Sequence, residues 1–266
     1  MPEGDVVYRT ARRLGRALDG LALTRSDFRV PRHATADLTG RTVLATVSRG
    51  KHLLTRVEGG LTVHTHLRME GSWQISPAGR GLPPGDVIRL VLANARWQAV
   101  GVRLGMVDLV ATGEEERLVG HLGPDLLAAD WDEADEAEVV RRLARRPETS
   151  IGVALLDQRN VAGIGTIYRA ETLFLAGVSP WRRVGTIEDL GVIVSLARRL
   201  MNANKERPDR ATTGDLRPGR SMWVYGRAGR PCLRCGHRIS RGEMGTQPQE
   251  RLIVWCRHCQ PGEPTG

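Results

Sequence analysis

Residue types suited to chemistry stand at both ends of the chain. The sequence begins Met1-Pro2-Glu3-Gly4, and initiator methionine is usually removed before proline, so we expect Pro2 to be a free N-terminal secondary amine. An α-amino group titrates near pH ~8, so part of it is unprotonated at neutral pH and able to attack a carbonyl carbon, giving a cationic iminium. Glu3 adds a carboxyl group for proton transfer. Most such starts are frayed leaders without a role.

The four cysteines near the other end form two Cys-x-x-Cys pairs. They are Cys232, Cys235, Cys256 and Cys259. Residues 236–255 separate the pairs, a spacing typical of a four-cysteine zinc site. Four thiolates complete tetrahedral Zn²⁺ and leave no position for a substrate, so we expect one structural zinc per chain, with a rubredoxin-like iron site as the alternative. His237 and His258 are close enough in sequence to compete as ligands, but a complete cysteine set argues against it.

The segment between the cysteine pairs predicts a small hairpin. Gln249 to Trp255 reads as a strand that carries one arginine, Arg251. A hairpin too small to hold a core needs a metal to stabilise it, and the metal would hold Arg251 in a fixed place. Surface solubility is the ordinary explanation for such an arginine.

Composition and charge narrow the class of partner. The 266 residues carry a formal net charge of +9, and only Lys51 and Lys205 are lysines among 39 basic residues. GC-rich codons explain the preference for arginine but not the positive excess, which points to nucleic acid. No run reaches the ~18 to 20 apolar residues of a membrane span, and no signal sequence opens the chain. We expect a soluble, cytoplasmic, nucleoid-associated protein with no membrane partner.

The elements that would position these residues change in kind along the chain. Asp5 to Leu18 has apolar residues at helical spacing, so we expect a helix directly behind Pro2, with its positive end facing the same place. Short β-rich runs separated by Gly, Pro and polar breaks follow, and they favour an antiparallel sandwich or barrel. The expected strands are Leu21–Val30, Thr42–Arg49, His52–Val57, Leu61–His66, Val87–Leu92, Trp97–Val102 and Met106–Val110.

Two loops of this half carry residues that suit DNA. In Arg49-Gly50-Lys51-His52, the lysine places an ammonium group on a glycine turn that could hold a phosphate. A lysine that simply faces solvent explains the pattern equally well. The loop from His66 to Gly71 carries Arg68 and Met69. Methionine is usually buried in a core, but an exposed one at a loop tip can wedge between stacked bases.

A helical pattern begins near Gly123-Pro124-Asp125. A helix followed by a glycine turn and a second helix is often used to present backbone N–H groups to DNA phosphates, and a plain αα-hairpin is the alternative. Polar residues from Arg207 to Arg220 predict a mobile loop. The expected elements are a helix capped by Asp130 and stopped by Pro147, a short helix Ile151–Gln158, the turn Arg159–Gly165, a helix Thr166–Ala176, and a helix from a Thr186-x-x-Asp189 capping box to Asn204.

Taken together, the sequence resembles the family of formamidopyrimidine-DNA glycosylase and endonuclease VIII, over nearly its whole length. Met-Pro-Glu-Gly-Asp and the stretch Trp223–Arg227 look most like the actinobacterial endonuclease VIII branch. The motifs that carry the resemblance are Met1-Pro2-Glu3-Gly4, Arg49-Gly50-Lys51, the His66–Gly71 loop, Asp157-Gln158 with Gly163-Ile164-Gly165, and the C-terminal cysteine hairpin.

The resemblance implies an α+β fold of three parts, in a monomer that binds damaged DNA, double- or single-stranded. Residues 1–124 would form a catalytic β-sandwich with a leading helix. Residues 125–220 would form a helix–two-turn–helix domain, and residues 221–266 a zinc-finger hairpin. DNA would lie between the sandwich and the helical domain.

The resemblance also implies a role for each matching residue. Pro2 would attack C1′ of a damaged nucleoside and form a Schiff base, and Glu3 would act as general acid and base. Met69 would fill the gap left by the everted nucleotide. DNA contacts would come from Lys51, which also has a catalytic role, and from Arg68, Gly165, Thr166 and Arg251.

Two positions depart from the family pattern. Val6 stands where many relatives carry a second glutamate, which weakens the case for excision of an intact base but leaves the lyase step at abasic sites. Thr166 stands where an asparagine usually contacts phosphate, and its hydroxyl has a shorter reach.

The leading hypothesis is a bifunctional glycosylase and abasic-site lyase of base excision repair. It would remove oxidised bases, mainly pyrimidines, and nick the strand by β/δ-elimination. The alternatives are a preference for 8-oxoguanine and formamidopyrimidine, a damaged-DNA binder with lyase activity only or none, and a generic zinc-ribbon nucleic-acid binder.

Overall fold

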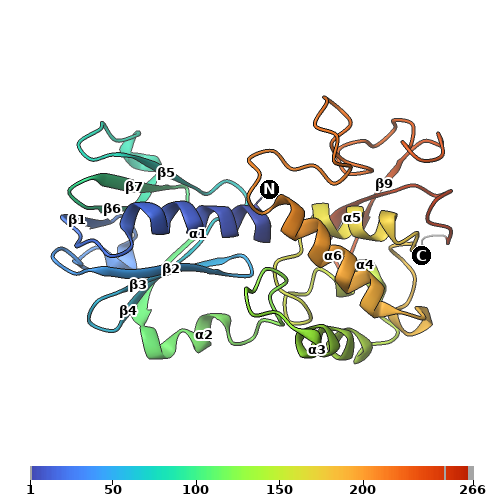
Figure 1. Cartoon of the computed structure of the whole chain (residues 1–266), viewed down its shortest axis with the longest axis horizontal. Helices are drawn as coiled ribbons and strands as arrows, with labels where there is room; N and C mark the ends of the chain where they lie inside the picture. The colour runs from blue at the N-terminus through green and yellow to red at the C-terminus, as the bar shows by residue number, and fades with distance from the viewer. Residues whose placement is uncertain (1, 249, 263–266) are drawn as a thin grey trace. The chain divides into compact units, whose positions relative to one another are not determined.

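The computed structural model describes residues 2–248 and 250–262. The chain divides between His121 and Leu122 into two compact units, unit 1 and unit 2 (Figure 1). Within the described residues, no helix is both long and apolar enough to cross a lipid bilayer.

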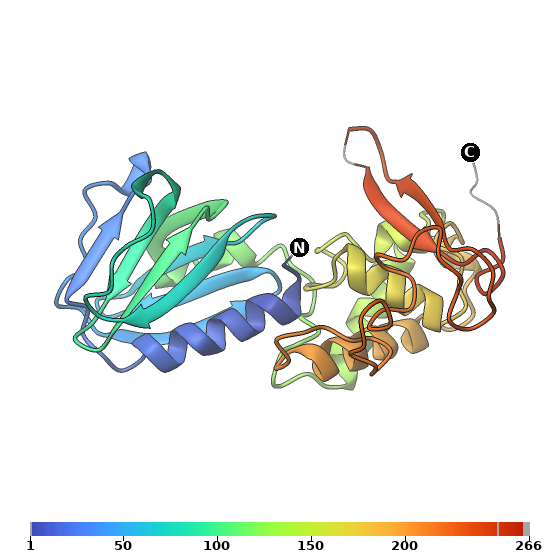
Figure 2. The same cartoon turned by 90° about the horizontal axis from the view of Figure 1, so that it is seen from above.

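Unit 1 is a β-sandwich with a leading helix. Its two four-stranded antiparallel sheets have the strand orders β1-β6-β7-β5 and β2-β3-β4-β8. Helix α1 packs on strands of both sheets and lies along them (Figure 2). The elements of the unit are α1 (Gly4–Leu18), β1 (Arg25–Phe28), β2 (Val43–Arg49), β3 (His52–Val57), β4 (Leu61–His66), β5 (Ser72–Pro77), β6 (Ile88–Ala93), β7 (Trp97–Val102), β8 (Met106–Ala111) and α2 (Glu116–Val119).

The apolar spacing of α1 explains how it is held. Val7, Leu14 and Leu18 are buried in a core that also contains residues of both sheets, whereas Arg12 and Arg13 are exposed. One apolar stripe of the helix therefore faces the sandwich and the basic side faces solvent.

The structure corrects the strand prediction in two places. The predicted strand Leu21–Val30 is confined to β1, because Leu23 exchanges backbone hydrogen bonds with residues 40 and 41 before β1 reaches β6. Strand β5 was not predicted, because every second residue is polar (Ser72, Gln74 and Ser76) and the segment lacks a β-rich run. It pairs with β7 at the edge of its sheet.

Unit 2 is helical and ends in a hairpin. Helix α5 packs on α6 and on β10, and α3 packs on α6. The elements are α3 (Glu133–Ala144), α4 (Ile151–Ala154), α5 (Thr166–Leu175), the short 3-10 helix η4 (Val184–Thr186), α6 (Leu190–Asn204), β9 (Ser240–Met244) and β10 (Arg251–Trp255). The α+β prediction, with a sandwich, a helical part and a four-cysteine hairpin, is confirmed.

Two helix starts differ from the predictions. Asp132, not Asp130, caps α3, because its carboxylate accepts hydrogen bonds from the backbone N–H groups of Ala134 and Asp135. The predicted box at Thr186 is wrong. Thr186 ends η4, and Asp189 itself caps α6 by accepting from the Val192 N–H at 3.1 Å.

Candidate functional site

Pro2 and Glu3 stand at the N-terminus of α1. Glu3 is the N-cap residue and is fully buried, Asp5 in the first turn is buried as well, and Pro2 is half-buried. The positive end of the helix dipole favours carboxylates at this end. The described chain starts at Pro2, and the predicted removal of Met1 lies outside the described residues.

Lys51 is carried by a tight hairpin turn between β2 and β3. Arg49 pairs with His52, so Gly50 and Lys51 form the turn, and Gly50 adopts the positive φ of 58° that glycine allows. Lys51 is half-buried. Burial lowers the pKa of its ammonium, and the negative charge of Glu3 opposes that shift. Unit 1 therefore brings the Lys51 ammonium into the field of the Glu3 carboxylate, and we call Pro2, Glu3 and Lys51 the N-terminal site.

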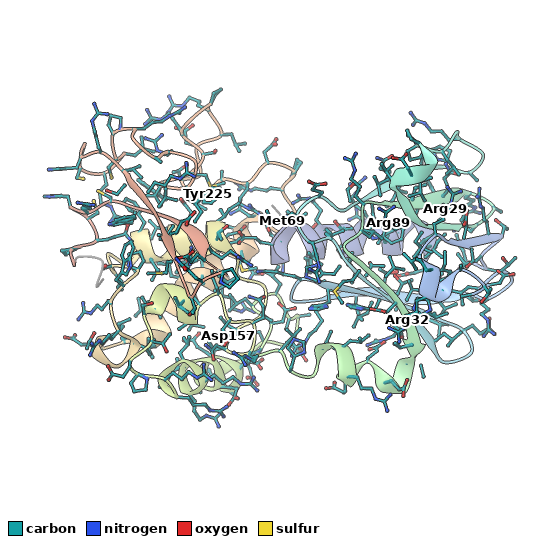
Figure 3. All side chains as sticks on the ribbon, turned by 180° about the vertical axis from the view of Figure 1, so that it is seen from behind. Arg29, Arg32, Met69, Arg89, Asp157 and Tyr225 are labelled. Atoms are coloured by element: carbon teal, nitrogen blue, oxygen red, sulfur yellow. The ribbon has the colours of Figure 1, made fainter. Side chains whose placement is uncertain are left out.

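The loop after β4 exposes a methionine, as the sequence prediction required. Met69 is 63% exposed. Its position is labelled in Figure 3. The loop is tight, because the Gly71 N–H donates to the Leu67 carbonyl at 2.9 Å, and a Cβ on Gly71 would lie 2.4 Å from that oxygen. Arg68 has a positive φ of 51°, and its N–H donates to His66 Nδ1 at 2.9 Å. The loop is held by its backbone while Met69 extends from it.

A cluster of histidines next to Lys51 escaped the sequence prediction. Cross-strand pairing sets His52 opposite His66 and His64 opposite Asp108, so these side chains share one face of the sheet. The His52 ring lies 5.1 Å from that of His64, 4.9 Å from that of His66 and 6.4 Å from that of His121, between ring centroids. We call these four histidines and Asp108 the histidine array.

Hydrogen bonds in the array run in one direction. His64 Nδ1 donates to the Asp108 carboxylate at 3.4 Å, which leaves His64 Nε2 to accept from His52 Nδ1 at 2.8 Å. Burial, together with the smaller effect of nearby positive charge, lowers the pKa of His52 to about 3 and that of His66 to about 4. At neutral pH these rings are therefore uncharged, although they adjoin Lys51.

In unit 2, a glutamine organises the glycine turn before α5. The Gln158 amide donates to the carbonyls of Leu156 and Ile164, both at 2.9 Å, and its oxygen accepts from the Gly163 N–H at 3.0 Å. Gln158 therefore belongs to the turn, and the predicted helix to Gln158 is cut short at Ala154. Gly165 is the N-cap of α5, so the positive end of that helix dipole lies at this turn.

Thr166 is the first residue of α5 and is buried. Only 4% of its surface is exposed. The predicted phosphate contact through the hydroxyl would therefore need a side chain that the structure keeps inside the unit. Gly165 is buried as well, so the burial pattern supports neither of these two predicted contacts.

The cysteine sulfurs come together as the spacing predicted. All four lie within 4.8 Å of one another, with 3.9 Å between Cys232 and Cys259 and 3.4 Å between Cys235 and Cys256. Sulfurs at ~2.3 Å from a tetrahedral ion stand about 3.8 Å apart, so this set fits a four-coordinate metal ion.

Arg251 begins β10 and is exposed. It pairs with Met244 of β9, and its neighbour Leu252 accepts a hydrogen bond at 2.6 Å from Arg169. Arg169 is fully buried in α5 and also donates to the Gly152 carbonyl. Helix α5 therefore holds the start of β10 in place. Gln249, the first residue of the predicted strand, lies outside the described residues.

A second buried charge of α5 was also missed. The Glu171 carboxylate is fully buried and accepts from the N–H groups of Trp223, Val224 and Tyr225 at 2.8, 2.9 and 2.8 Å. The Thr212 hydroxyl donates to it as well. Burial raises the pKa of this carboxyl, and the four donors oppose the shift. Glu171 thereby ties both ends of the chain between Thr212 and Tyr225 to α5.

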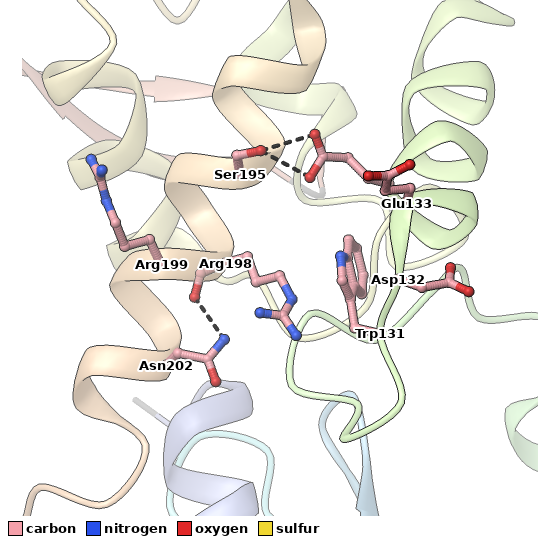
Figure 4. A pocket seen from close by; sticks show the side chains of 8 residues that line it. Trp131, Asp132, Glu133, Ser195, Arg198, Arg199 and Asn202 are labelled. Atoms are coloured by element: carbon pink, nitrogen blue, oxygen red, sulfur yellow. Dashed lines mark hydrogen bonds between the residues drawn. The ribbon is translucent and has the colours of Figure 1, made fainter.

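A hollow of about 600 Å³ in unit 2 is a poor candidate for DNA. It lies between α3 and α6 (Figure 4), where the Arg198 guanidinium stands 5.2 Å from the Trp131 ring centroid. The Ser195 hydroxyl hydrogen-bonds both oxygens of Glu136, at 2.9 and 2.8 Å. With Asp132 and Glu133, the wall holds three carboxylates against two guanidiniums, those of Arg198 and Arg199, and this net negative charge would repel phosphates.

The chain matches two family models. Residues 1–122 match the model of the formamidopyrimidine-DNA glycosylase N-terminal domain, and residues 122–204 match that of the formamidopyrimidine-DNA glycosylase H2TH domain. The two matches meet at residue 122, at the division between the two units.

Curated relatives cover nearly the whole chain. The probable endonuclease 8 2 of Streptomyces coelicolor is 53% identical, over 98% of this chain and 95% of its own length. The DNA-(apurinic or apyrimidinic site) lyase Nei2 of Mycolicibacterium smegmatis is 45% identical, over 98% and 99%. The formamidopyrimidine-DNA glycosylase of Stenotrophomonas maltophilia is 33% identical, over 98% and 100%.

Solved structures show the same fold. The formamidopyrimidine-DNA glycosylase of Lactococcus lactis, in a complex with DNA containing an abasic site, has a TM-score of 0.81 at 23% identity, covering 98% of this chain and 100% of that one. A complex of the Lactococcus lactis protein with DNA containing an oxidised pyrimidine has a TM-score of 0.82 at 23% identity, covering 98% and 100%. With both family models matched and relatives similar along their full length, the chain belongs to the family of formamidopyrimidine-DNA glycosylase and endonuclease VIII.

Proposed function

We propose that this protein is a DNA glycosylase and abasic-site lyase of base excision repair. Family membership supports the reaction class, since relatives of high identity are named as endonuclease 8 and as an abasic-site lyase. The observation that carries the assignment is the N-terminal site, where the buried carboxylate of Glu3 follows Pro2 in the chain and acts electrostatically on Lys51, a lysine of lowered pKa.

The proposed reaction starts at the Pro2 nitrogen, which requires that Met1 be removed. The nitrogen attacks C1′ of the damaged nucleoside, the bond from C1′ to the base breaks, and the leaving base takes a proton from a general acid. The product is an aminal; its C1′–O4′ bond then breaks, O4′ takes a proton, and the Pro2 nitrogen becomes part of an iminium. This iminium acidifies the C2′ protons. Loss of one of them expels the 3′ phosphate, and a second elimination expels the 5′ phosphate. Glycosylase and lyase steps thus share one amine.

Glu3 and Lys51 are the proposed proton carriers. Glu3 can give or take a proton beside the sugar because it is held at the helix N-terminus next to Pro2. Burial lowers the pKa of Lys51, which makes its ammonium a stronger acid than an exposed lysine. Lys51 would therefore both attract a phosphate and supply a proton to a leaving group.

Each unit contributes its own proposed contacts to DNA. In unit 1, Met69 would enter the gap left by the everted nucleotide, an eversion that costs a few kcal/mol, and Arg68 would contact DNA beside it. In unit 2, Gly165 and the N-terminus of α5 would face a phosphate, with Thr166 a weaker candidate, and Arg251 would grip another.

The metal is proposed to be one Zn²⁺ ion with a structural role. The four sulfurs fit a tetrahedral ion, and four thiolates leave no ligand position for water or substrate. The ion would stabilise the β9–β10 hairpin, and no reaction step uses it. The hairpin with its flanks, 221–266, would then be a third part after 1–124 and 125–220.

Lesion preference is proposed to be oxidised pyrimidines and abasic sites, in a monomeric enzyme. Val6 favours a second candidate, a lyase that acts on abasic sites and excises intact bases poorly. The valine side chain has no carboxylate to offer the reaction, and it packs against the hydrophobic core. Oligonucleotides that each contain one lesion, in duplex and single-stranded form, separate the two when excision and nicking are scored independently.

Glu3→Gln provides the matched variant for that assay. We expect it to bind abasic DNA like the parent protein and to lose most base excision, because the amide cannot transfer a proton. A parent protein that nicks no abasic DNA would contradict the proposed function, and one that nicks abasic DNA but excises no base would favour the lyase.

A further inference from the structure

Two histidines lie on the outer side of the cysteine cluster. The rings of His237 and His258 are stacked, with centroids 4.3 Å apart and planes 4° from parallel, and both residues are exposed. One nitrogen of each ring and the Cys235 sulfur all lie within 4.8 Å of one another.

The Cys235 sulfur belongs to two candidate sets of metal ligands, the four cysteines and the group of Cys235 with two histidines. Cys232 and Cys256 are buried, whereas Cys235 is half-buried and faces the two histidines. A divalent ion held by four thiolates is a centre of net negative charge, and a thiolate bound to one metal keeps lone pairs that can bind a second. Two imidazoles and one thiolate suit borderline ions such as Zn²⁺, Co²⁺ and Ni²⁺.

We propose that Cys235, His237 and His258 form a second, exposed metal-binding position, the outer position, which shares the Cys235 sulfur with the four-cysteine set. Three protein ligands leave room for water in the coordination sphere, as in sites that exchange their ligands. The imidazoles are neutral ligands and the shared thiolate is already deprotonated by the inner ion, so the second ion binds without displacing a proton from Cys235.

The stacked rings set the strength of this position. A metal bound to an imidazole lies close to the plane of the ring, and two parallel planes do not meet at a common ion. One ring must therefore turn about its χ2 bond and give up the stacking, and because both residues are exposed it can turn toward solvent. Arg238 and Arg257 adjoin the two histidines in sequence, and their positive charge opposes a second cation. The outer position therefore binds more weakly than the inner one.

Cobalt added to the zinc-loaded protein tests the proposal. Full-length protein carrying one Zn²⁺ per chain is titrated with Co²⁺ and followed by native mass spectrometry and by cobalt–thiolate charge-transfer absorption. We expect a species holding one zinc and one cobalt, with the thiolate band, and we expect a mild chelator to remove the cobalt alone. His237→Gln combined with His258→Gln should remove the cobalt and the band and keep the zinc.

His121→Gln is the matched control, because it removes an exposed histidine from the array of unit 1. We expect this variant to bind zinc and cobalt like the parent protein. Absence of the mixed-metal species in the parent protein would overturn the proposal. So would cobalt binding without a thiolate band, a double variant that keeps the cobalt, or a double variant that loses its zinc.

Discussion

The histidine array should make the stability of unit 1 depend on pH. His52 and His66 have pKa values of about 3 and about 4 in the folded protein, held down chiefly by burial. An unfolded histidine titrates near pH ~6.5, so below that pH the unfolded chain binds protons that the folded chain refuses. The free energy of unfolding is therefore highest above pH ~6.5 and falls as the pH drops toward these lowered pKa values.

The size of the effect follows from the two pKa values. Between about pH 7.5 and pH 5.5, one histidine that stays neutral when folded and titrates normally when unfolded lowers the free energy of unfolding by about 1.4 kcal/mol. His52 and His66 together give about 2.7 kcal/mol over this range. The pKa of His64 is also lowered by burial, which adds to the same trend.

His52→Gln isolates one of these contributions. The glutamine amide can still donate to His64 Nε2, as His52 Nδ1 does at 2.8 Å, but it cannot take up a proton. We expect the loss of stability between about pH 7.5 and 5.5 to shrink by about 1.4 kcal/mol in this variant. His121→Gln, which replaces an exposed ring of the array, is the control and should behave like the parent protein.

Urea unfolding at a series of pH values measures this effect. Unfolding is monitored by pulsed hydrogen exchange on peptides from β3 and β4, so that only unit 1 is observed. If His52→Gln and the parent protein lose the same stability on acidification, His52 is not neutral in the folded state, and the account of the array is wrong.

Three further outcomes are expected. Glu171→Ala leaves three N–H groups, one buried and two partly buried, without an acceptor and should lower the stability of unit 2 by about 3–5 kcal/mol in urea unfolding, with Glu171→Gln less damaging. Gly71→Ala forces a Cβ against the Leu67 carbonyl and should cost about 1–3 kcal/mol in the same assay, whereas Gly81→Ala meets open space and should be neutral. Lys51→Ala should reduce the slope of log Kd against log salt for DNA by about 1, and an unchanged slope would remove its phosphate contact.

Local patterns made much of the fold and part of the site predictable. The apolar spacing behind Pro2 defines α1, and the glycine in Arg49-Gly50-Lys51 matches the positive φ that a two-residue turn needs. The spacing of the cysteines likewise predicts that the four sulfurs come together, because the two Cys-x-x-Cys pairs flank one hairpin. Each of these predictions depends on residues close in the chain.

Features that depend on distant residues were missed. The histidine array forms only when β8 pairs with β4 and sets Asp108 opposite His64, a register that the sequence does not reveal. His52, His64 and His66 do alternate along their strands, which is the one signal that would have suggested a shared face. Glu171 looked like an ordinary helix residue, because its partners lie more than forty positions away.

Errors at helix starts have a similar cause. Asp130, Asp132 and Thr186 all suit a cap by residue type, and the chain direction before the helix decides which one accepts the free N–H groups. At the start of α6, η4 occupies Thr186 and leaves Asp189 as the cap.

The central claim is that the reactive atom is the nitrogen of Pro2. In the most direct measurement, the protein is mixed with abasic-site DNA and borohydride, which reduces the iminium to a stable amine. The covalent complex is then digested, and the attached sugar is located by peptide mass spectrometry. We expect the adduct on an N-terminal peptide that begins with Pro2. We also expect the Pro2→Gly variant to give a much lower yield of adduct than the parent protein. An adduct on Lys51, or an active protein that keeps Met1, would contradict the account.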